Sequence, residues 1–63
     1  MQGTVVYYDN DRGYGFIEQD ENRGRDMFFH HSDCEKVPPL YSRVRYEVKE
    51  GRKGPEAANV CII

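Results

Sequence analysis

The sequence predicts an all-β domain in which five short antiparallel strands close into a small barrel. Five short segments are rich in the β-branched and aromatic residues that favour strands, and polar, glycine-containing turns separate them. No segment shows a helical pattern longer than about one turn. The 63 residues contain no repeat and no linker, so we expect a single domain over residues 1–63.

The first two strands come from the N-terminal third of the chain. Gly3–Tyr8 is a run of strand-forming residues, although an unbroken run does not reveal which face is buried. Asp9–Gly13 follows with the residue types of a tight turn. We expect the second strand at Tyr14–Glu18. After it comes an exposed loop at Gln19–Arg25, which is entirely polar and contains a glycine.

The third strand, Asp26–His30, leads into the longest connection, His31–Ser42. Ser32 and Glu35 have the spacing of a capping box, with the serine at the cap. Pro38 and the proline after it follow too soon for a long helix. We therefore expect at most one short turn of 3₁₀ helix there.

The fourth strand has the clearest signal of the five. Along Arg43–Lys49, apolar and charged side chains alternate, with Val44, Tyr46 and Val48 on one face. Glu50–Pro55 is a turn that contains two glycines, and Glu56–Ile63 completes the barrel as the fifth strand.

Four rings share one face when the second and third strands pair antiparallel. They are Tyr14, Phe16, Phe28 and His30, and as cross-strand neighbours they would lie within about 4.5–8 Å of one another. Such a platform can stack the bases of a single nucleic-acid strand. The alternative is that these rings form the core. Two facts favour an exposed platform: a histidine is costly in a core, and the opposite face offers a purely apolar set, Val5, Ile17, Met27 and Phe29.

The charge balance limits how such a platform could bind. The net charge is −2, from 9 basic and 11 acidic residues, which argues against a protein held mainly by phosphate contacts. The basic residues of the predicted turns and loops are Arg12, Arg23, Arg25, Arg52 and Lys53, and a barrel could bring them to one side. Arg12, Arg23 and Arg25 are the candidates for phosphate contacts.

Two motifs resemble those of the cold-shock domain family. Arg12-Gly13-Tyr14-Gly15-Phe16-Ile17 resembles its first ribonucleoprotein motif, and Phe28-Phe29-His30-His31-Ser32 resembles its second. The opening Gly3-Thr4-Val5 and the closing Lys53-Gly54-Pro55-Glu56-Ala57-Ala58-Asn59-Val60 are similar to the two ends of that family. The resemblance therefore covers nearly the whole chain.

The resemblance implies a barrel of the oligonucleotide/oligosaccharide-binding (OB) type that binds single-stranded RNA and DNA. It also implies a role as an RNA chaperone or as a regulator of transcription or translation. The base-stacking residues would be Tyr7, Tyr14, Phe16, Phe28, His30 and His31. Arg12 would be the basic residue that opens the first motif, and Asp26 and Lys53 match positions that often touch the ligand.

Several positions depart from the family pattern. Tyr7 stands where a tryptophan is usual, Val6 replaces a lysine, Asp9 an asparagine and His31 a phenylalanine. The connection Ser32–Ser42 is shorter than usual and its usual aromatic has no clear counterpart, with Val37 and Leu40 as the nearest apolar residues. These changes remove stacking area and positive charge. We therefore expect the usual mode of binding at lower affinity, with a shallow salt dependence.

Metal binding and catalysis are both disfavoured. His30, His31, Cys34 and Cys61 match no zinc-binding spacing. His31, Ser32 and Asp33 are the residue types of a hydrolase triad, but consecutive residues of an extended chain cannot converge on one substrate atom. We expect no enzymatic activity, no cofactor, no metal and no small-molecule substrate.

The remaining expectations concern location and partners. No apolar run spans a bilayer and no signal-peptide pattern opens the chain, so we expect a cytoplasmic protein that does not bind membranes. In that reducing compartment both cysteines would be free thiols. We expect a monomer, with a dimer through the apolar Ile62-Ile63 end as the alternative. The rival function is a protein-interaction module of the same fold, because an exposed aromatic patch suits either kind of partner.

Overall fold

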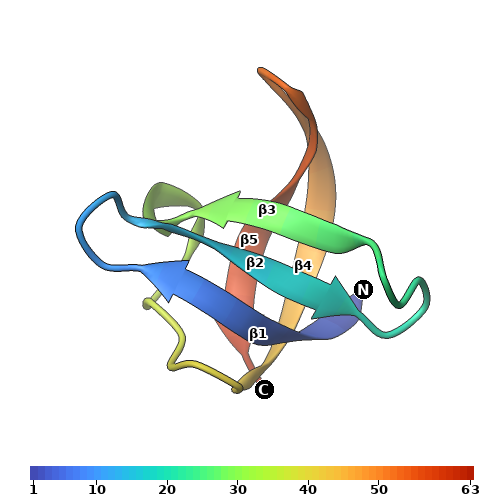
Figure 1. Cartoon of the computed structure of the whole chain (residues 1–63), viewed down its shortest axis with the longest axis horizontal. Helices are drawn as coiled ribbons and strands as arrows, with labels where there is room; N and C mark the ends of the chain where they lie inside the picture. Colours follow the sequence, from blue (N-terminus) through green and yellow to red (C-terminus); the bar gives the residue numbers. More distant parts are fainter.

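The computed structural model describes all of residues 1–63 and contains five strands in one antiparallel sheet. The elements are β1 (Gln2–Asp9), β2 (Tyr14–Gln19), β3 (Asp26–His30), the 3₁₀ turn η1 (His31–Asp33), β4 (Arg43–Gly51) and β5 (Gly54–Ile62). Along the sheet the strands run in the order β3-β2-β1-β4-β5 (Figure 1). The all-β prediction is confirmed, with each strand within two residues of its expected start and end.

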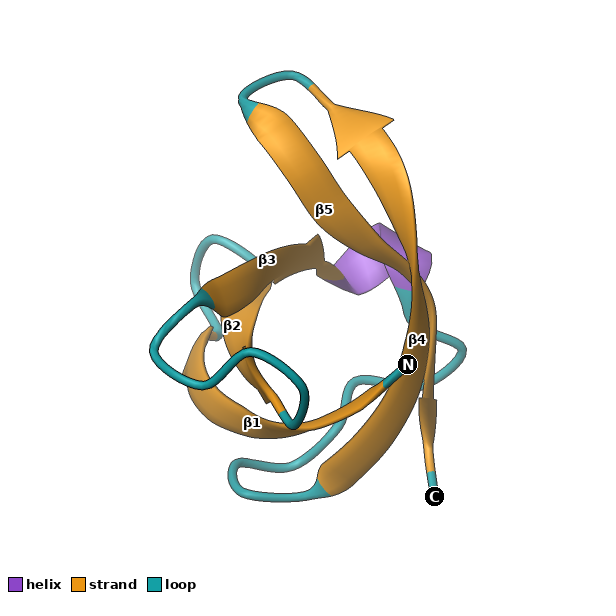
Figure 2. Ribbon diagram, turned by 90° about the vertical axis from the view of Figure 1, so that its right-hand side faces the viewer, coloured by secondary structure: helices purple, strands orange, loops and turns teal.

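The sheet curls until its two edge strands approach each other. Figure 2 shows the ring of strands, with β3 facing β5 across the gap and η1 between their ends. A parallel bridge between Cys34 and Val60, and a 3.2 Å hydrogen bond from the Glu35 N–H to the Val60 carbonyl, join the segment after η1 to β5. The barrel is therefore closed at this end by the connection that follows β3.

The core lies on the inward face of the curled sheet. Its fully buried members are Val5, Ile17, Phe29, Val44, Tyr46, Ala57 and Val60. The inward face predicted for the first three strands is confirmed for Val5, Ile17 and Phe29, whereas Met27 is only partly buried against them. The Tyr46 hydroxyl donates a 3.0 Å hydrogen bond to Gln19 Oε1, so the one phenol in the core is satisfied.

A register shift in β1 decides which of its side chains point inward. Val5 lies opposite Ile17, but Tyr7 lies opposite Phe16, so one extra β1 residue interrupts the ladder between them. Without this bulge Tyr7 would share the face of Val5, because side chains two residues apart point the same way. With it, Tyr7 turns outward and Tyr8 packs against the core.

One local expectation needs correction. The 3₁₀ turn forms, but His30 and not Ser32 is its N-cap residue, so the turn begins earlier than the capping box indicated. His30 takes the capping role because its ring Nδ1 accepts the backbone N–H of Ser32. In β4, Val48 continues the apolar alternation but is 44% exposed. The end of the β4–β5 hairpin extends beyond the barrel (Figure 2), so Val48 has no core to enter.

No helix in the structure is long and apolar enough to cross a membrane.

Candidate nucleic-acid interface

The rings of β2 and β3 form one continuous outer surface. Tyr14 lies opposite His30 and Phe16 opposite Phe28, which is the pairing that the sequence predicted. The Tyr14 and Phe28 rings stack with centroids 5.5 Å apart, and Phe16 meets Phe28 edge-on at 5.9 Å. All four side chains are half-buried, whereas Phe29 beside them is fully buried. The exposed-platform hypothesis is confirmed over the core alternative.

Tyr7 extends this surface onto β1. Its ring centroid is 6.1 Å from that of Tyr14 and 6.1 Å from that of Phe16, and the residue is 46% exposed. Repulsion from Tyr14 is the main cause that raises the pKa of Tyr7 above its ordinary value of 10.0. Tyr7 therefore keeps its hydroxyl proton at neutral pH. We call Tyr7, Tyr14, Phe16, Phe28 and His30 the aromatic platform.

The β1–β2 turn places a cation and a second imidazole beside the platform. Asp9 Oδ1 accepts the Arg12 N–H at 3.1 Å, which fixes the backbone that carries Arg12. Gly13 has φ +72°, and a Cβ there would lie 2.4 Å from Cδ2 of His31. The His31 ring thus rests directly on the glycine, with its centroid 4.3 Å from that of His30.

A cleft of about 600 Å³ separates the platform from the tip of the β4–β5 hairpin. On the platform side it is lined by Arg12, Tyr14, Phe16 and Phe28, and on the hairpin side by Arg52, Lys53, Gly54, Pro55 and Glu56. Arg12 and Lys53, far apart in sequence, therefore border the same space. Cations at both walls and aromatic rings along one wall suit a negatively charged strand with stacked bases.

Sequence reasoning missed four residues of this cleft as site residues: Arg52, Gly54, Pro55 and Glu56. Arg52 was noted only as one of the basic residues of the turns, and the residues after Lys53 carried no binding signal of their own. A turn reveals its function only when the fold shows what it faces. Here the hairpin is long enough to bring its tip over rings that belong to β2 and β3.

Asp26 lies apart from the cleft. It begins β3 opposite Glu18, on the same face as Phe28 and His30 but at the other end of the strand. The side chain is exposed, as are Arg23 and Arg25 in the loop before it. The structure therefore places Asp26 at the edge of the platform, where it borders neither the cleft nor the turn that holds Arg12.

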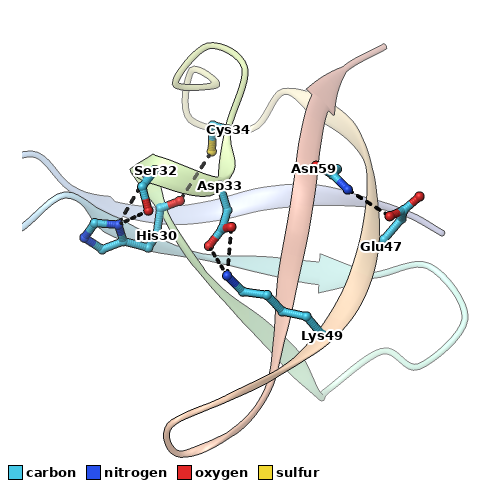
Figure 3. A network of polar contacts seen from close by, with 7 residues as sticks. All are labelled: His30, Ser32, Asp33, Cys34, Glu47, Lys49 and Asn59. Atoms are coloured by element: carbon cyan, nitrogen blue, oxygen red, sulfur yellow. Dashed lines mark hydrogen bonds and ion pairs between the residues drawn. The ribbon is translucent and has the colours of Figure 1, made fainter.

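An ion pair and a hydrogen bond connect elements around the interface. Lys49 Nζ on β4 lies 2.8 Å from both carboxylate oxygens of Asp33 in η1, and this pairing raises the pKa of Lys49 (Figure 3). Farther along the hairpin, the Asn59 amide donates to Glu47 Oε1 at 2.9 Å. The Lys49–Asp33 ion pair links the β4–β5 hairpin, whose tip forms one wall of the cleft, to η1, the turn that follows β3.

Both cysteines are free thiols and border a second cavity, of about 280 Å³. Burial is the main cause that raises the pKa of Cys34 to about 11, so its reactive thiolate is scarce at neutral pH. The Cys34 Sγ donates to the His30 carbonyl at 3.8 Å. No group of three or more metal-binding side chains converges here or elsewhere in the chain.

Comparison with known proteins gives one consistent family. A family model described as the 'Cold-shock' DNA-binding domain matches residues 1–63. A cold shock-like protein of Thermotoga maritima is 42% identical, with 100% of this chain and 98% of that protein covered. A cold shock protein of Arthrobacter globiformis is 36% identical, with coverage of 98% and 97%. Cold shock-like protein CspA of Vibrio cholerae is 41% identical, with coverage of 100% and 94%. The chain therefore belongs to the cold-shock domain family, as the motifs of its second and third strands indicated.

Proposed function

We propose that this chain binds single-stranded RNA and DNA by stacking successive bases on the aromatic platform. The observation that carries the proposal is the outward set of rings from three neighbouring strands, beside a cleft bordered by cations. Binding of single-stranded nucleic acid agrees with membership in the cold-shock domain family. By holding bases unpaired, the protein would act as an RNA chaperone or as a regulator of transcription or translation.

Each residue of the interface has a distinct role in this proposal. Bases stack on the platform rings, and each stacked base contributes about 1–3 kcal/mol. His31 flanks the platform next to His30, and Arg12, Lys53 and Arg52 contact phosphates from the two walls of the cleft. Asp26, at the far edge, accepts a hydrogen bond from a base N–H, since a carboxylate can only accept.

The aromatic platform explains how a chain with a net negative charge could bind nucleic acid. Stacking needs no excess of positive charge, because every base has a π face. The cations that the interface uses are gathered at the cleft, whereas two other cations, Arg43 and Lys49, are paired with carboxylates elsewhere. The local charge of the cleft therefore matters more than the net charge of −2.

We further propose that the protein works in the cytoplasm as a monomer, without catalysis, cofactor or small-molecule substrate. One copy carries the rings of one wall and the cations of both walls of the cleft, so no second copy is needed to complete the interface. Stacking also breaks no covalent bond. A dimer remains the alternative, and sedimentation of the free protein distinguishes the two states.

The test is a titration with oligo-dT and oligo-U of about six to eight nucleotides, followed by tyrosine emission and amide chemical shifts. We expect quenching, with shifts centred on Tyr14, Phe16 and Phe28. Phe28→Ala should weaken binding about five- to 150-fold with the fold intact. The matched control is Tyr41→Ala, which removes a ring that is 70% exposed but lies outside the platform.

Two outcomes would contradict the proposal. Unfolding of the Phe28→Ala variant would mean that this ring stabilises the core and not a ligand. Absence of binding up to about 1 mM oligonucleotide, with the fold intact, would favour the rival function as a protein-interaction module.

A further inference from the structure

In the turn after β3, Ser32 forms hydrogen bonds with Nδ1 of the His30 ring. Nδ1 lies 2.8 Å from Ser32 Oγ and accepts the backbone N–H of Ser32 at 3.2 Å. A backbone N–H is only a donor, so the atom that it points at must present a lone pair. Nδ1 therefore carries no proton, and in the neutral ring the proton sits on Nε2.

The rest of the ring faces away from this turn. Figure 3 shows Nδ1 directed at Ser32 and the other ring nitrogen on the far side of the ring, away from Ser32 and Asp33. His30 lies opposite Tyr14 and two residues after Phe28, so it ends the row of platform rings. A stacking surface that is otherwise formed by Tyr and Phe rings thus ends in an N–H donor with no partner in the protein.

We propose that Ser32 is a positioning residue that holds His30 in the Nε2–H tautomer, so that His30 donates a hydrogen bond to an acceptor oxygen of the bound strand. This inference rests on the proposed function, because the acceptor belongs to the single-stranded ligand. Base carbonyls and phosphates both offer such oxygens. Ser32 itself does not touch the ligand in this arrangement.

A second contact restrains the same ring. The His31 centroid is 4.3 Å from that of His30, with the planes tilted by 37°, and His31 in turn rests on Gly13. Ser32 therefore restrains the ring through hydrogen bonds at one edge, and His31 packs beside it. A ring held in this way loses little freedom when it binds, which is the condition under which one hydrogen bond contributes most to affinity.

The first test reads the tautomer in the free protein. Long-range ¹H–¹⁵N spectra of the His30 ring should show a protonated Nε2 and an Nδ1 that accepts a hydrogen bond. Ser32→Ala removes the hydroxyl but keeps the backbone N–H, so Nε2 should stay protonated while the Nδ1 chemical shift moves toward that of a more weakly hydrogen-bonded nitrogen. Ser32→Thr should restore the wild-type pattern. A protonated Nδ1 in the neutral wild-type ring would overturn the proposal, whether or not any oligonucleotide binds.

The second test is a double-mutant cycle on oligo-dT affinity. His30→Phe keeps a ring for stacking but lacks the donor, and we expect about three- to tenfold weaker binding. Ser32→Ala should cost about threefold in the wild-type chain and nothing in the His30→Phe background, because it acts only through His30. An equal loss in both backgrounds, or full affinity of His30→Phe, would contradict the proposal.

The source of the acceptor oxygen is decided with modified strands. The P=O oxygen of a neutral methylphosphonate linkage is a weaker acceptor than a phosphate anion. If the penalty of His30→Phe shrinks on a methylphosphonate oligo-dT, the acceptor is a phosphate. If it is unchanged there, the acceptor is a base carbonyl. If wild-type protein binds no strand at all, the proposed function fails, while the tautomer measurement still decides the role of Ser32.

Discussion

Lys49 and Asp33 connect the β4–β5 hairpin to the turn that ends β3. Lys49 Nζ lies 2.8 Å from each Asp33 oxygen, so the contact is shared by both atoms of the carboxylate. The hairpin carries Arg52 and Lys53 on one wall of the cleft, and the turn follows the strand that carries Phe28 on the other. This ion pair therefore joins the two elements that carry the walls of the cleft.

Replacing Lys49 should affect binding more than stability. Lys49→Ala leaves the core untouched, and exposed ion pairs stabilise folded proteins little. The hairpin should become more mobile, which amide exchange of its residues would detect, and oligonucleotide affinity should fall about threefold. Lys36→Ala, which removes the same charge from an exposed residue of the β3–β4 connection, is the control. Equal losses of affinity in both variants would mean that only charge matters.

The cations of the cleft should determine the salt dependence of binding. Three of them border the cleft, Arg12, Arg52 and Lys53, and each phosphate neutralised on a single strand contributes about 0.7 to the slope of log K against log salt. We expect a slope of about −2 for oligo-dT, reduced by about 0.7 in Arg52→Gln and in Lys53→Gln. A wild-type slope steeper than about −4 would contradict the shallow dependence that the sequence predicts.

Gly15 leaves no space for a side chain between β1 and the core. A Cβ at this position would lie 2.4 Å from the Tyr7 carbonyl oxygen and 2.8 Å from the Phe29 ring. Gly15→Ala should therefore lower the free energy of unfolding by about 1–3 kcal/mol, as measured by urea denaturation. Gly24→Ala is the comparison, because a Cβ there meets nothing within 4 Å and only its φ of +87° is unfavourable. A smaller loss at Gly15 than at Gly24 would refute this account.

Tyr41 is held in a conformation that suits glycine. Its φ is 69°, and 70% of the residue is exposed, so the ring contributes little packing in return. Tyr41→Gly should raise the free energy of unfolding by about 0.5–1 kcal/mol through relief of this strain. Tyr41→Ala keeps the Cβ that causes the strain and should show no gain. Equal stability of the Gly and Ala variants would show that φ is not the cause.

The Arg43–Asp20 pair makes stability depend on pH in the acidic range. Hydrogen bonds from Arg43, 2.7 Å to Asp20 Oδ1 among them, lower the pKa of Asp20 below its ordinary value of 3.8. Because the folded state has the lower pKa, the contribution is present above that ordinary value and is lost as pH falls through the folded pKa. Asp20→Asn should thus unfold at lower urea than wild type at pH 7. The two midpoints should converge below pH 3.8. A gap that stays constant into strong acid would rule the pair out.

The pairing of β2 with β3 could be predicted because both segments are strand-forming and the loop between them is short and polar. Once the pairing is antiparallel, Phe16 and Phe28 must share the face opposite Ile17 and Phe29. The core face could be chosen too, since only one face is free of polar side chains. These are local patterns, and local patterns are what a sequence displays directly.

The family resemblance named Tyr7 as a stacking residue, but the strand pattern did not predict on which face its ring lies. Alternation counted from Val5 would point Tyr7 inward, and the β-bulge that reverses it appears only in the pairing of β1 with β2. The His30 cap is a similar case. The sequence favoured Ser32 as the cap because of its spacing to Glu35, but the folded turn brings the His30 ring onto the same N–H.

The sequence by itself thus determined the strands, the core face and the rings of β2 and β3, because each depends on neighbours a few residues apart. The tertiary structure decided that Tyr7 joins those rings, that Arg52 and Glu56 face them across a cleft, and that Lys49 reaches Asp33. These relationships join strands distant in sequence. Their geometry depends on the curvature of the sheet and on the position of the register shift in β1. Both are set by the packing of the whole barrel.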